Sequence, residues 1–191
     1  MRTDEGFVHA WTIGAEIAPE RWQAMHADMV RVLSAASRSL EQGRGEDALA
    51  MLRGPNGLGH VRIQADVIAF NGNAFLGEAG DPFSIERVAE HGIIARRSRD
   101  GSRRVVRRCD TRGRPYDLAV CAVLLTVLHH LGRDMRVGTS GSPRQGWSRA
   151  ASVVRATLGD CGQLVQMETG LLRWVGTAVA GEQGTTRSIA S

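Results

Sequence analysis

The chain has 191 residues, of which 42% are hydrophobic and 23% charged, and its formal net charge is +4. These values are typical of a soluble globular protein with enough chain to bury one core. No apolar run reaches the ~18 residues of a membrane span, and the N-terminal segment carries acids where a secretory signal would be apolar, so we expect a cytoplasmic protein.

The first half of the chain predicts a strand, a long helix and further strands. Residues 7 to 17 hold β-formers in loose alternation and should form a strand. Pro19 suits a first helical position, and apolar residues then recur at three- and four-residue spacing to about residue 40. This pattern indicates an amphipathic helix that packs on a sheet.

Residues 54 to 59 form a cluster of turn residues, which lacks the Lys-Ser or Lys-Thr pair of a phosphate-binding loop. Residues 61 to 70 predict one strand, and residues 82 to 88 predict an edge strand. Residues 93 to 97 and 103 to 107 flank Asp100-Gly101, and an Asp-Gly pair between two β-capable runs predicts a hairpin.

The most apolar helix of the chain is expected from Pro115, with Asp117 in its first turn, where a carboxylate meets the positive end of the helix dipole. From residue 118 to 128 only Thr126 is polar, so no face is left for water and the helix should be buried. Gly132 should end it.

The last third predicts a strand at 135 to 139 and a second amphipathic helix, which Ser142 caps and Gly159 ends. Residues 161 to 176 are compatible with a short helix or a strand. We therefore expect an α+β fold, with a mixed or mainly antiparallel sheet packed by about three helices, one of them a buried core helix. Residues 1–176 should form a single domain and residues 177–191 a flexible tail.

Two segments carry a resemblance to a group of uncharacterised bacterial and phage proteins. They are Phe70-Asn71-Gly72, and Arg114-Pro115-Tyr116-Asp117 leading into an apolar helix that ends in His129-His130-Leu131-Gly132. The likeness covers roughly residues 7 to 158 and implies the same order of elements, a phage or mobile-element relationship, and no known activity. The group's Cys-Lys pair and Ser-Ser-Asp-Gly turn correspond here to Cys109-Asp110 and Thr139-Ser140-Gly141, without the lysine or that aspartate.

Residues 96 to 114 hold nine arginines and two acids, whereas the whole chain contains no lysine. Guanidinium groups bind anionic oxygens in pairs, so this stretch is a candidate phosphate or nucleic-acid surface. The alternative is a solvated hairpin in an arginine-biased protein. No aromatic residues are interleaved, so base stacking is not expected. No zinc finger, ribonucleoprotein sheet signature or helix-turn-helix spacing is present, so sequence-specific recognition of nucleic acid is not expected either. The candidate nucleic-acid patch comprises Arg96, Arg97, Arg99, Arg103 and Arg104.

The joint between the arginines and the core helix is a second candidate site, for an anion or a small ligand at a helix N-terminus. The alternative is structural: Asp117 caps the helix or pairs with an arginine, and Tyr116 closes the core. The candidate ligand-binding residues are Arg107, Arg108, Arg112, Arg114, Tyr116 and Asp117.

We predict no metal site and no cofactor. His129 and His130 are adjacent and cannot comfortably bind one ion, and the remaining histidines show no ligand spacing. Three cysteines without CxxC spacing argue against disulfides and structural zinc. Cys109 is the one candidate nucleophile, because neighbouring arginines would lower its pKa, and Cys121 should be an inert core residue.

The sequence thus favours a non-catalytic cytoplasmic binding or accessory protein that contacts an acidic partner through its arginine-rich hairpin and the start of the core helix. One alternative is an enzyme acting on a phosphorylated or other anionic small molecule at that start. The other is a homo-oligomer whose interface holds Leu171, Leu172 and Trp174. The enzyme alternative requires a concave pocket, whereas the binding protein requires only a flat basic surface. A sheet that helices cover on one side alone would favour the homo-oligomer.

Overall fold

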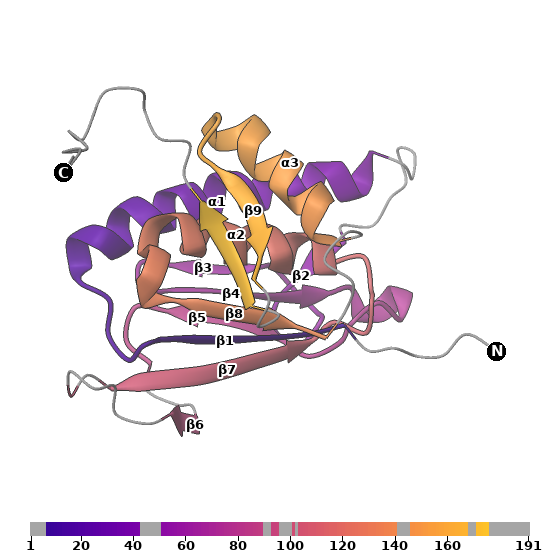
Figure 1. Cartoon of the computed structure of the whole chain (residues 1–191). Coiled ribbons are helices and arrows are strands. Elements are labelled where there is room, and N and C mark those ends of the chain that lie inside the picture. The colour runs from indigo at the N-terminus through magenta and orange to yellow at the C-terminus, as the bar shows by residue number, and fades with distance from the viewer. Residues whose placement is uncertain are drawn as a thin grey trace, which may run out of the picture.

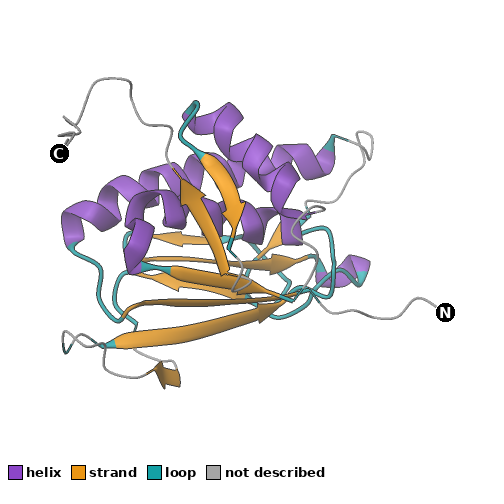
Figure 2. Ribbon diagram, viewed as in Figure 1, coloured by secondary structure: helices purple, strands orange, loops and turns teal. Residues whose placement is uncertain are grey.

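A computed structural model describes residues 7–42, 51–89, 93–95, 101, 103–140, 146–167 and 171–175 of the chain. Within these residues the chain forms three α-helices, two short 3-10 helices and ten strands, and the strands make two antiparallel sheets. The three helices gather on the same side of the larger sheet (Figure 1, Figure 2). This arrangement confirms the predicted α+β class.

The larger sheet has six strands in the order β6-β7-β1-β8-β10-β9, and each neighbouring pair is antiparallel. The predicted hairpin of residues 93–107 is confirmed as β6 and β7, and the undecided stretch 161–176 contains the hairpin of β9 and β10. The strands are β1 (Val8–Gly14), β6 (Ile93–Ala95), β7 (Arg104–Asp110), β8 (Arg136–Thr139), β9 (Gln163–Gln166) and β10 (Leu171–Val175).

The smaller sheet is arranged around one central strand, which pairs with three others. Its strands are β2 (Leu52–Arg53), β3 (Arg62–Gln64), β4 (Val67–Gly72) and β5 (Phe83–Glu86), with β4 at the centre. The prediction of one strand over residues 61–70 is wrong, because the chain reverses at residues 65 and 66. All of β3 is exposed and all of β4 is buried, so the two runs have different environments and no shared alternation.

The helices are α1 (Pro19–Glu41), α2 (Asp117–Leu131) and α3 (Gly146–Leu158). Helix α2 packs against both others, and all its residues except His129 and His130 are buried, which confirms the predicted core helix. It begins at Asp117, two residues after the predicted start, because residues 111–117 form successive turns. The apolar α2 has 15 residues and the longer α1 is amphipathic, so no described helix could cross a membrane.

The two sheets meet on the inner side of β1, the side that faces the helices. Trp11 of β1 packs on Phe83 of β5, with ring centroids 5.2 Å apart, and Phe83 packs on Phe70 of β4 at 5.0 Å. Because side chains alternate along a strand, His9 and Ile13 share this buried side with Trp11. The side chains two residues before and after Trp11 on β1 therefore point into the core.

Candidate functional site

A tight loop, residues 111–116, joins β7 to α2. Arg112 (φ 53°) and Gly113 (φ 64°) adopt left-handed backbone conformations, and Asp110 Oδ1 supports the turn by accepting from the Arg112 backbone N–H at 3.0 Å. The turn leaves Arg112 and Arg114 exposed while it buries Tyr116 and Asp117. The structure therefore separates the arginines of this joint from its phenol and its carboxylate.

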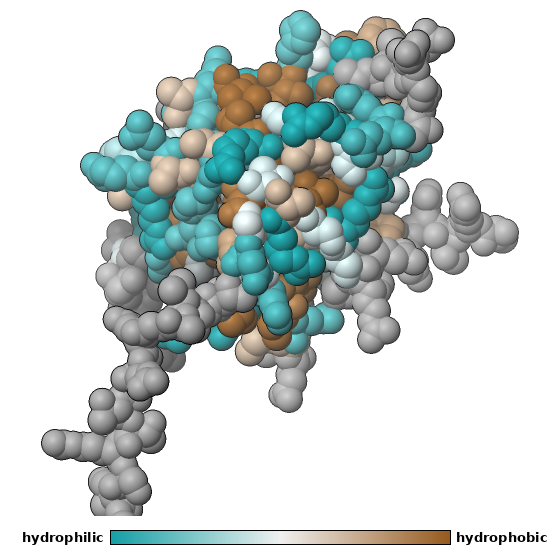
Figure 3. Space-filling model, turned by 90° about the horizontal axis from the view of Figure 1, so that it is seen from above, coloured by the Kyte–Doolittle hydropathy of each residue, from teal (hydrophilic) through white to brown (hydrophobic). Residues whose placement is uncertain are grey.

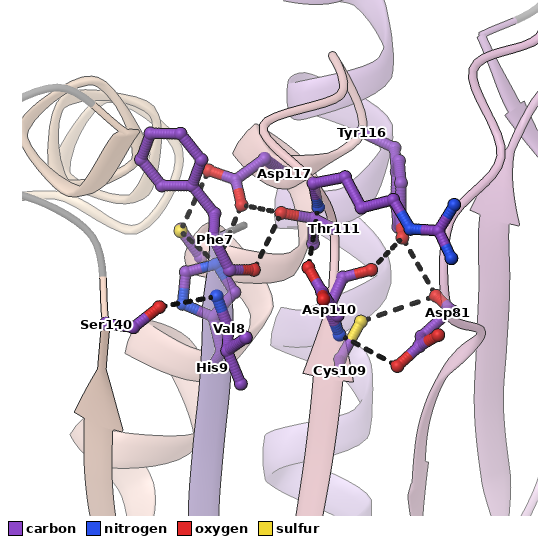
Figure 4. Close-up of polar contacts among 12 residues, drawn as sticks. Phe7, Val8, His9, Asp81, Cys109, Asp110, Thr111, Tyr116, Asp117 and Ser140 are labelled. Atoms are coloured by element: carbon purple, nitrogen blue, oxygen red, sulfur yellow. Dashed lines mark hydrogen bonds and ion pairs between the residues drawn. The ribbon is translucent and has the colours of Figure 1, made fainter. Parts of the chain in front are cut away.

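Asp117 is the centre of a buried polar cluster (Figure 4). Its Oδ1 lies 2.7 Å from His9 Nε2 and also accepts the hydroxyl hydrogen bond of Thr111. Its Oδ2 accepts from the Cys121 thiol at 3.6 Å. His9, Thr111 and Cys121 are fully buried, and the cluster connects β1, the loop after β7 and the first turn of α2.

Tyr116 belongs to a second buried network beside the first (Figure 4). Its hydroxyl donates to the backbone oxygen of Asp81 at 2.9 Å, and the Cys109 thiol points to the same oxygen at 3.4 Å. The Asp81 carboxylate accepts from the Asp110 backbone N–H at 3.1 Å. These contacts fasten the loop before β5 to the end of β7.

The prediction that arginines activate Cys109 is wrong. Burial raises the pKa of the Cys109 thiol to about 12, and burial likewise raises the pKa of the Tyr116 hydroxyl. Arg108 precedes Cys109 on the same strand, so its side chain leaves the opposite face of the sheet. The thiol stays protonated and is a poor nucleophile.

The two segments of the resemblance meet in space. Asn71 is buried, with its amide donating to the backbone oxygens of Pro55 and Gly80 and its Oδ1 accepting from the Gly72 and Gly80 backbone N–H groups. A Cβ at Gly72 would lie 2.9 Å from Tyr116 Cδ1. The Phe-Asn-Gly segment thus forms part of the packing around Tyr116.

The arginines predicted for the two sites lie in different places. Arg107 faces the smaller sheet, where its guanidinium pairs with the Glu86 carboxylate at 2.9 Å. Arg103 is exposed, and Arg104 and Arg108 project from the other side of β7. Arg96, Arg97 and Arg99 lie outside the described residues.

The side of the larger sheet that faces away from the helices carries arginines from three strands. The register sets Arg108 opposite Ala10 and Arg136 opposite Thr12, so both side chains share the side of β1 opposite to Trp11. We call this surface the arginine face; it comprises Arg104 and Arg108 of β7, Arg136 of β8 and Arg173 of β10.

The positive charge of the arginine face is only partly matched by acids. Arg108 lies 3.9 Å from the Asp110 carboxylate, and Arg104 donates to the backbone oxygen of Asp134 at 3.3 Å. In the described part of the chain, Arg136 and Arg173 are exposed and have no acidic partner. Between the arginines stand the small residues Ala10, Thr12, Gly14 and Gly138 and the aliphatic Val106 and Leu171.

A groove of about 760 Å³ opens where the arginine face meets the end of α2. Its volume falls in the range of small-molecule sites. No described residue of its lining is acidic. The lining includes the apolar Leu128, Met135 and Trp174 and the arginines Arg133, Arg136 and Arg173.

On the face seen from above the helices, the exposed apolar residues are dispersed (Figure 3). Seen from above the helices, brown apolar patches alternate with teal polar side chains and do not form one continuous area (Figure 3). Leu172 and Trp174, predicted as interface residues, are 1% and 8% exposed because they pack into the core of their own chain. These two residues are therefore not available to a second copy, whereas Leu171 is half-buried and lies on the same side of the sheet as Arg136.

The sequence interpretation missed the partners of Asp117 and half of the arginine face. His9 alternates in phase with Trp11 and Ile13, and that alternation could have placed it in the core. Arg136 and Arg173 are distant in sequence from the arginine-rich stretch. Only the pairing of β8 with β1 and of β10 with β8 shows that they share a surface with its arginines.

No family model, curated protein or solved structure matches this chain. The resemblance to the bacterial and phage group therefore remains a prediction, and function rests on the geometry.

Proposed function

We propose that this protein is a non-catalytic, cytoplasmic binding protein that holds a polyanion on its arginine face. The observation that carries the proposal is the alignment of Arg104, Arg108, Arg136 and Arg173 on the side of the six-stranded sheet that no described helix covers. Strands lie about 4.8 Å apart, so these charges span a surface roughly 15 Å wide, the scale of an extended chain of phosphates or carboxylates.

The character of the surface favours contacts with the anionic backbone of the partner. Small residues between the arginines let a broad ligand approach the sheet. Among the described residues the arginine face carries no aromatic side chain, so we expect no stacking on nucleic-acid bases there, and binding should tolerate any sequence. The partner class is thus an extended polyanion, such as duplex nucleic acid or an acidic polysaccharide.

The two alternatives have less support. For an enzyme at the start of α2, both oxygens of Asp117 are occupied by hydrogen bonds from the protein's own side chains. For a homo-oligomer, helices do cover one side of the sheet alone, as that alternative requires (Figure 2). The uncovered side, however, carries like charges that would repel in two facing copies.

Binding of a fluorescent duplex oligonucleotide and of heparin at low salt tests the proposal. The variant R108Q/R136Q/R173Q removes three exposed charges from the arginine face, and we expect it to bind at least about 10-fold more weakly. The control R38Q/R62Q/R155Q changes the net charge equally, on α1, β3 and α3. Equal weakening in both variants would contradict the proposal, and so would a stable dimer that only the first variant dissociates.

A further inference from the structure

Three side chains that commonly bind metal ions converge inside the molecule. His9 comes from β1, and Asp117 and Cys121 are four residues apart on one face of α2. One ligand atom from each lies within 4.8 Å of the others. His9 Nε2 is 3.8 Å from Cys121 Sγ, and Asp117 Oδ2 is 3.6 Å from the same sulfur.

We propose that His9, Asp117 and Cys121 form a binding site for one zinc ion. Thiolate, imidazole and carboxylate are the ligands that Zn²⁺ selects, at distances of about 2.0 to 2.3 Å. Tetrahedral geometry at these lengths separates neighbouring ligand atoms by roughly 3.3 to 3.8 Å. Both separations from the sulfur match this requirement.

The contact between His9 and Asp117 must rearrange when an ion binds. His9 Nε2 and Asp117 Oδ1 are 2.7 Å apart, at hydrogen-bond distance, and this hydrogen bond must be released before Nε2 can bind an ion. Thr111 donates to Oδ1, whereas Oδ2 faces the sulfur, so Oδ2 is the oxygen placed for the ion. Gly146 lies against this oxygen and contributes no side chain to the site, since a Cβ there would stand 2.7 Å from Oδ2.

Among the residues that the structure describes, the other nitrogen of His9 has no hydrogen bond that fixes the tautomer of the ring. His9 Nδ1 is buried and has no hydrogen-bond partner within the described structure. A hydrogen-bond donor at Nδ1 would keep the ring proton on Nε2, whereas Nε2 must be unprotonated to bind the metal through its lone pair. Because no such donor is present, the proton can move to Nδ1 without breaking a hydrogen bond there.

Charge balance also favours a dication at this position. When zinc binds, Cys121 releases its thiol proton to solvent, and the ion then faces one thiolate, one carboxylate and one neutral imidazole. The sum is zero, which suits a buried site because an uncompensated charge in the interior is costly. Sequence patterns did not predict this site, since His9 is more than a hundred residues away from its partners.

Cobalt binding provides the direct test, because Co²⁺ occupies zinc sites and a cobalt–thiolate bond absorbs in the near ultraviolet. We expect the purified full chain, stripped with a chelator, to bind about one equivalent of Co²⁺ with this band, and Zn²⁺ to displace it and raise Tm. Cys121→Ala should lose the band and weaken binding on the order of 100-fold or more.

Cys109→Ala is the matched control, because Cys109 is also fully buried and lies in the neighbouring network. It should keep the band and the rise in Tm. If Cys121→Ala does not fold, the isosteric Cys121→Ser replaces it. Absence of a thiolate band in the wild type, or a band that survives at Cys121→Ala and disappears at Cys109→Ala, would overturn the proposal. Both outcomes are independent of polyanion binding.

Discussion

Asp117 fastens three segments that are distant in sequence, through hydrogen bonds from His9, Thr111 and Cys121. Such a carboxylate is stable in the interior only because each oxygen has donors, and removal of its charge leaves those donors without their acceptor. The first turn of α2 adds a favourable dipole. At the scale of residues, stability therefore depends on a few fully bonded polar groups within an apolar core.

Asp117→Asn should lower the free energy of unfolding by about 2 to 4 kcal/mol, because the amide cannot accept all three hydrogen bonds. Urea denaturation with a chelator present measures this loss without any contribution from metal. Asp66→Asn, at an exposed turn, is the control and should change stability by less than ~0.5 kcal/mol. An unchanged midpoint for Asp117→Asn would contradict the structural role and support the enzyme alternative.

Gly146→Ala should also destabilise the fold, although alanine favours helices by about 0.5 to 1 kcal/mol. The new Cβ would lie 2.7 Å from Asp117 Oδ2, and the hydrogen bonds on that carboxylate leave it little freedom to move. We expect a net loss of about 1 to 3 kcal/mol in thermal or urea unfolding. A stabilised variant would show that the first turn of α3 does not pack on Asp117.

The burial of the Cys109 thiol predicts that the folded protein loses stability at alkaline pH. Its pKa rises from the ordinary 9.0 to about 12 on burial, so the folded state holds a proton that the unfolded state releases. This contribution is complete below about pH 9 and disappears as the pH rises toward 12. Urea midpoints at about pH 8 and about pH 10 should fall less in Cys109→Ala than in the wild type. Parallel falls in both proteins would contradict the burial of this thiol.

At the scale of elements, α2 organises the molecule, since it contacts α1, α3 and β10. Leu124→Asp should abolish cooperative folding, because an unpaired buried charge costs several kcal/mol against a total stability of roughly 5 to 15 kcal/mol. His129→Asp places the same residue at an exposed position of the same helix and should leave the fold intact. Circular dichroism with thermal melting distinguishes them, and a cooperative melt for Leu124→Asp would refute the core-helix assignment.

Local patterns were sufficient to predict most elements. The apolar stripe of α1 and the uninterrupted apolar run of α2 each indicate one environment over several turns, and turn residues mark the hairpin of β6 and β7. The prediction for residues 61–70 failed because the turn between the two strands, Ala65-Asp66, contains neither glycine nor proline. Without such residues the composition does not mark where one strand ends and the next begins.

The candidate site was less predictable, because its contacts depend on the packing of distant segments. Asp117 and Tyr116 could be singled out by their place at a helix start, yet the partners His9 and Asp81 come from other strands and loops. The pKa of Cys109 was predicted in the wrong direction because neighbours in sequence point to opposite sides of a strand. The success or failure of each prediction at the site depended on the direction of the side chains, which only the pairing of strands reveals.

At the scale of the whole molecule, the three helices lie on one side of the larger sheet, and no described helix covers the other side (Figure 1). A sheet exposed on one side normally alternates apolar inward and polar outward, and here the outward residues include four arginines among small and aliphatic residues. The charge comes from three strands that are separated in sequence by much of the chain. The central claim is that this surface releases counterions when it binds a polyanion.

The dependence of binding on salt tests that claim most directly. For duplex DNA, the logarithm of the binding constant falls with the logarithm of salt concentration by about 0.9 for each phosphate neutralised. We predict a slope of at least about 3 in the wild type, a slope smaller by about 2 to 3 in R108Q/R136Q/R173Q, and an unchanged slope in R38Q/R62Q/R155Q. Equal slopes in all three proteins would contradict the assignment of polyanion binding to the arginine face.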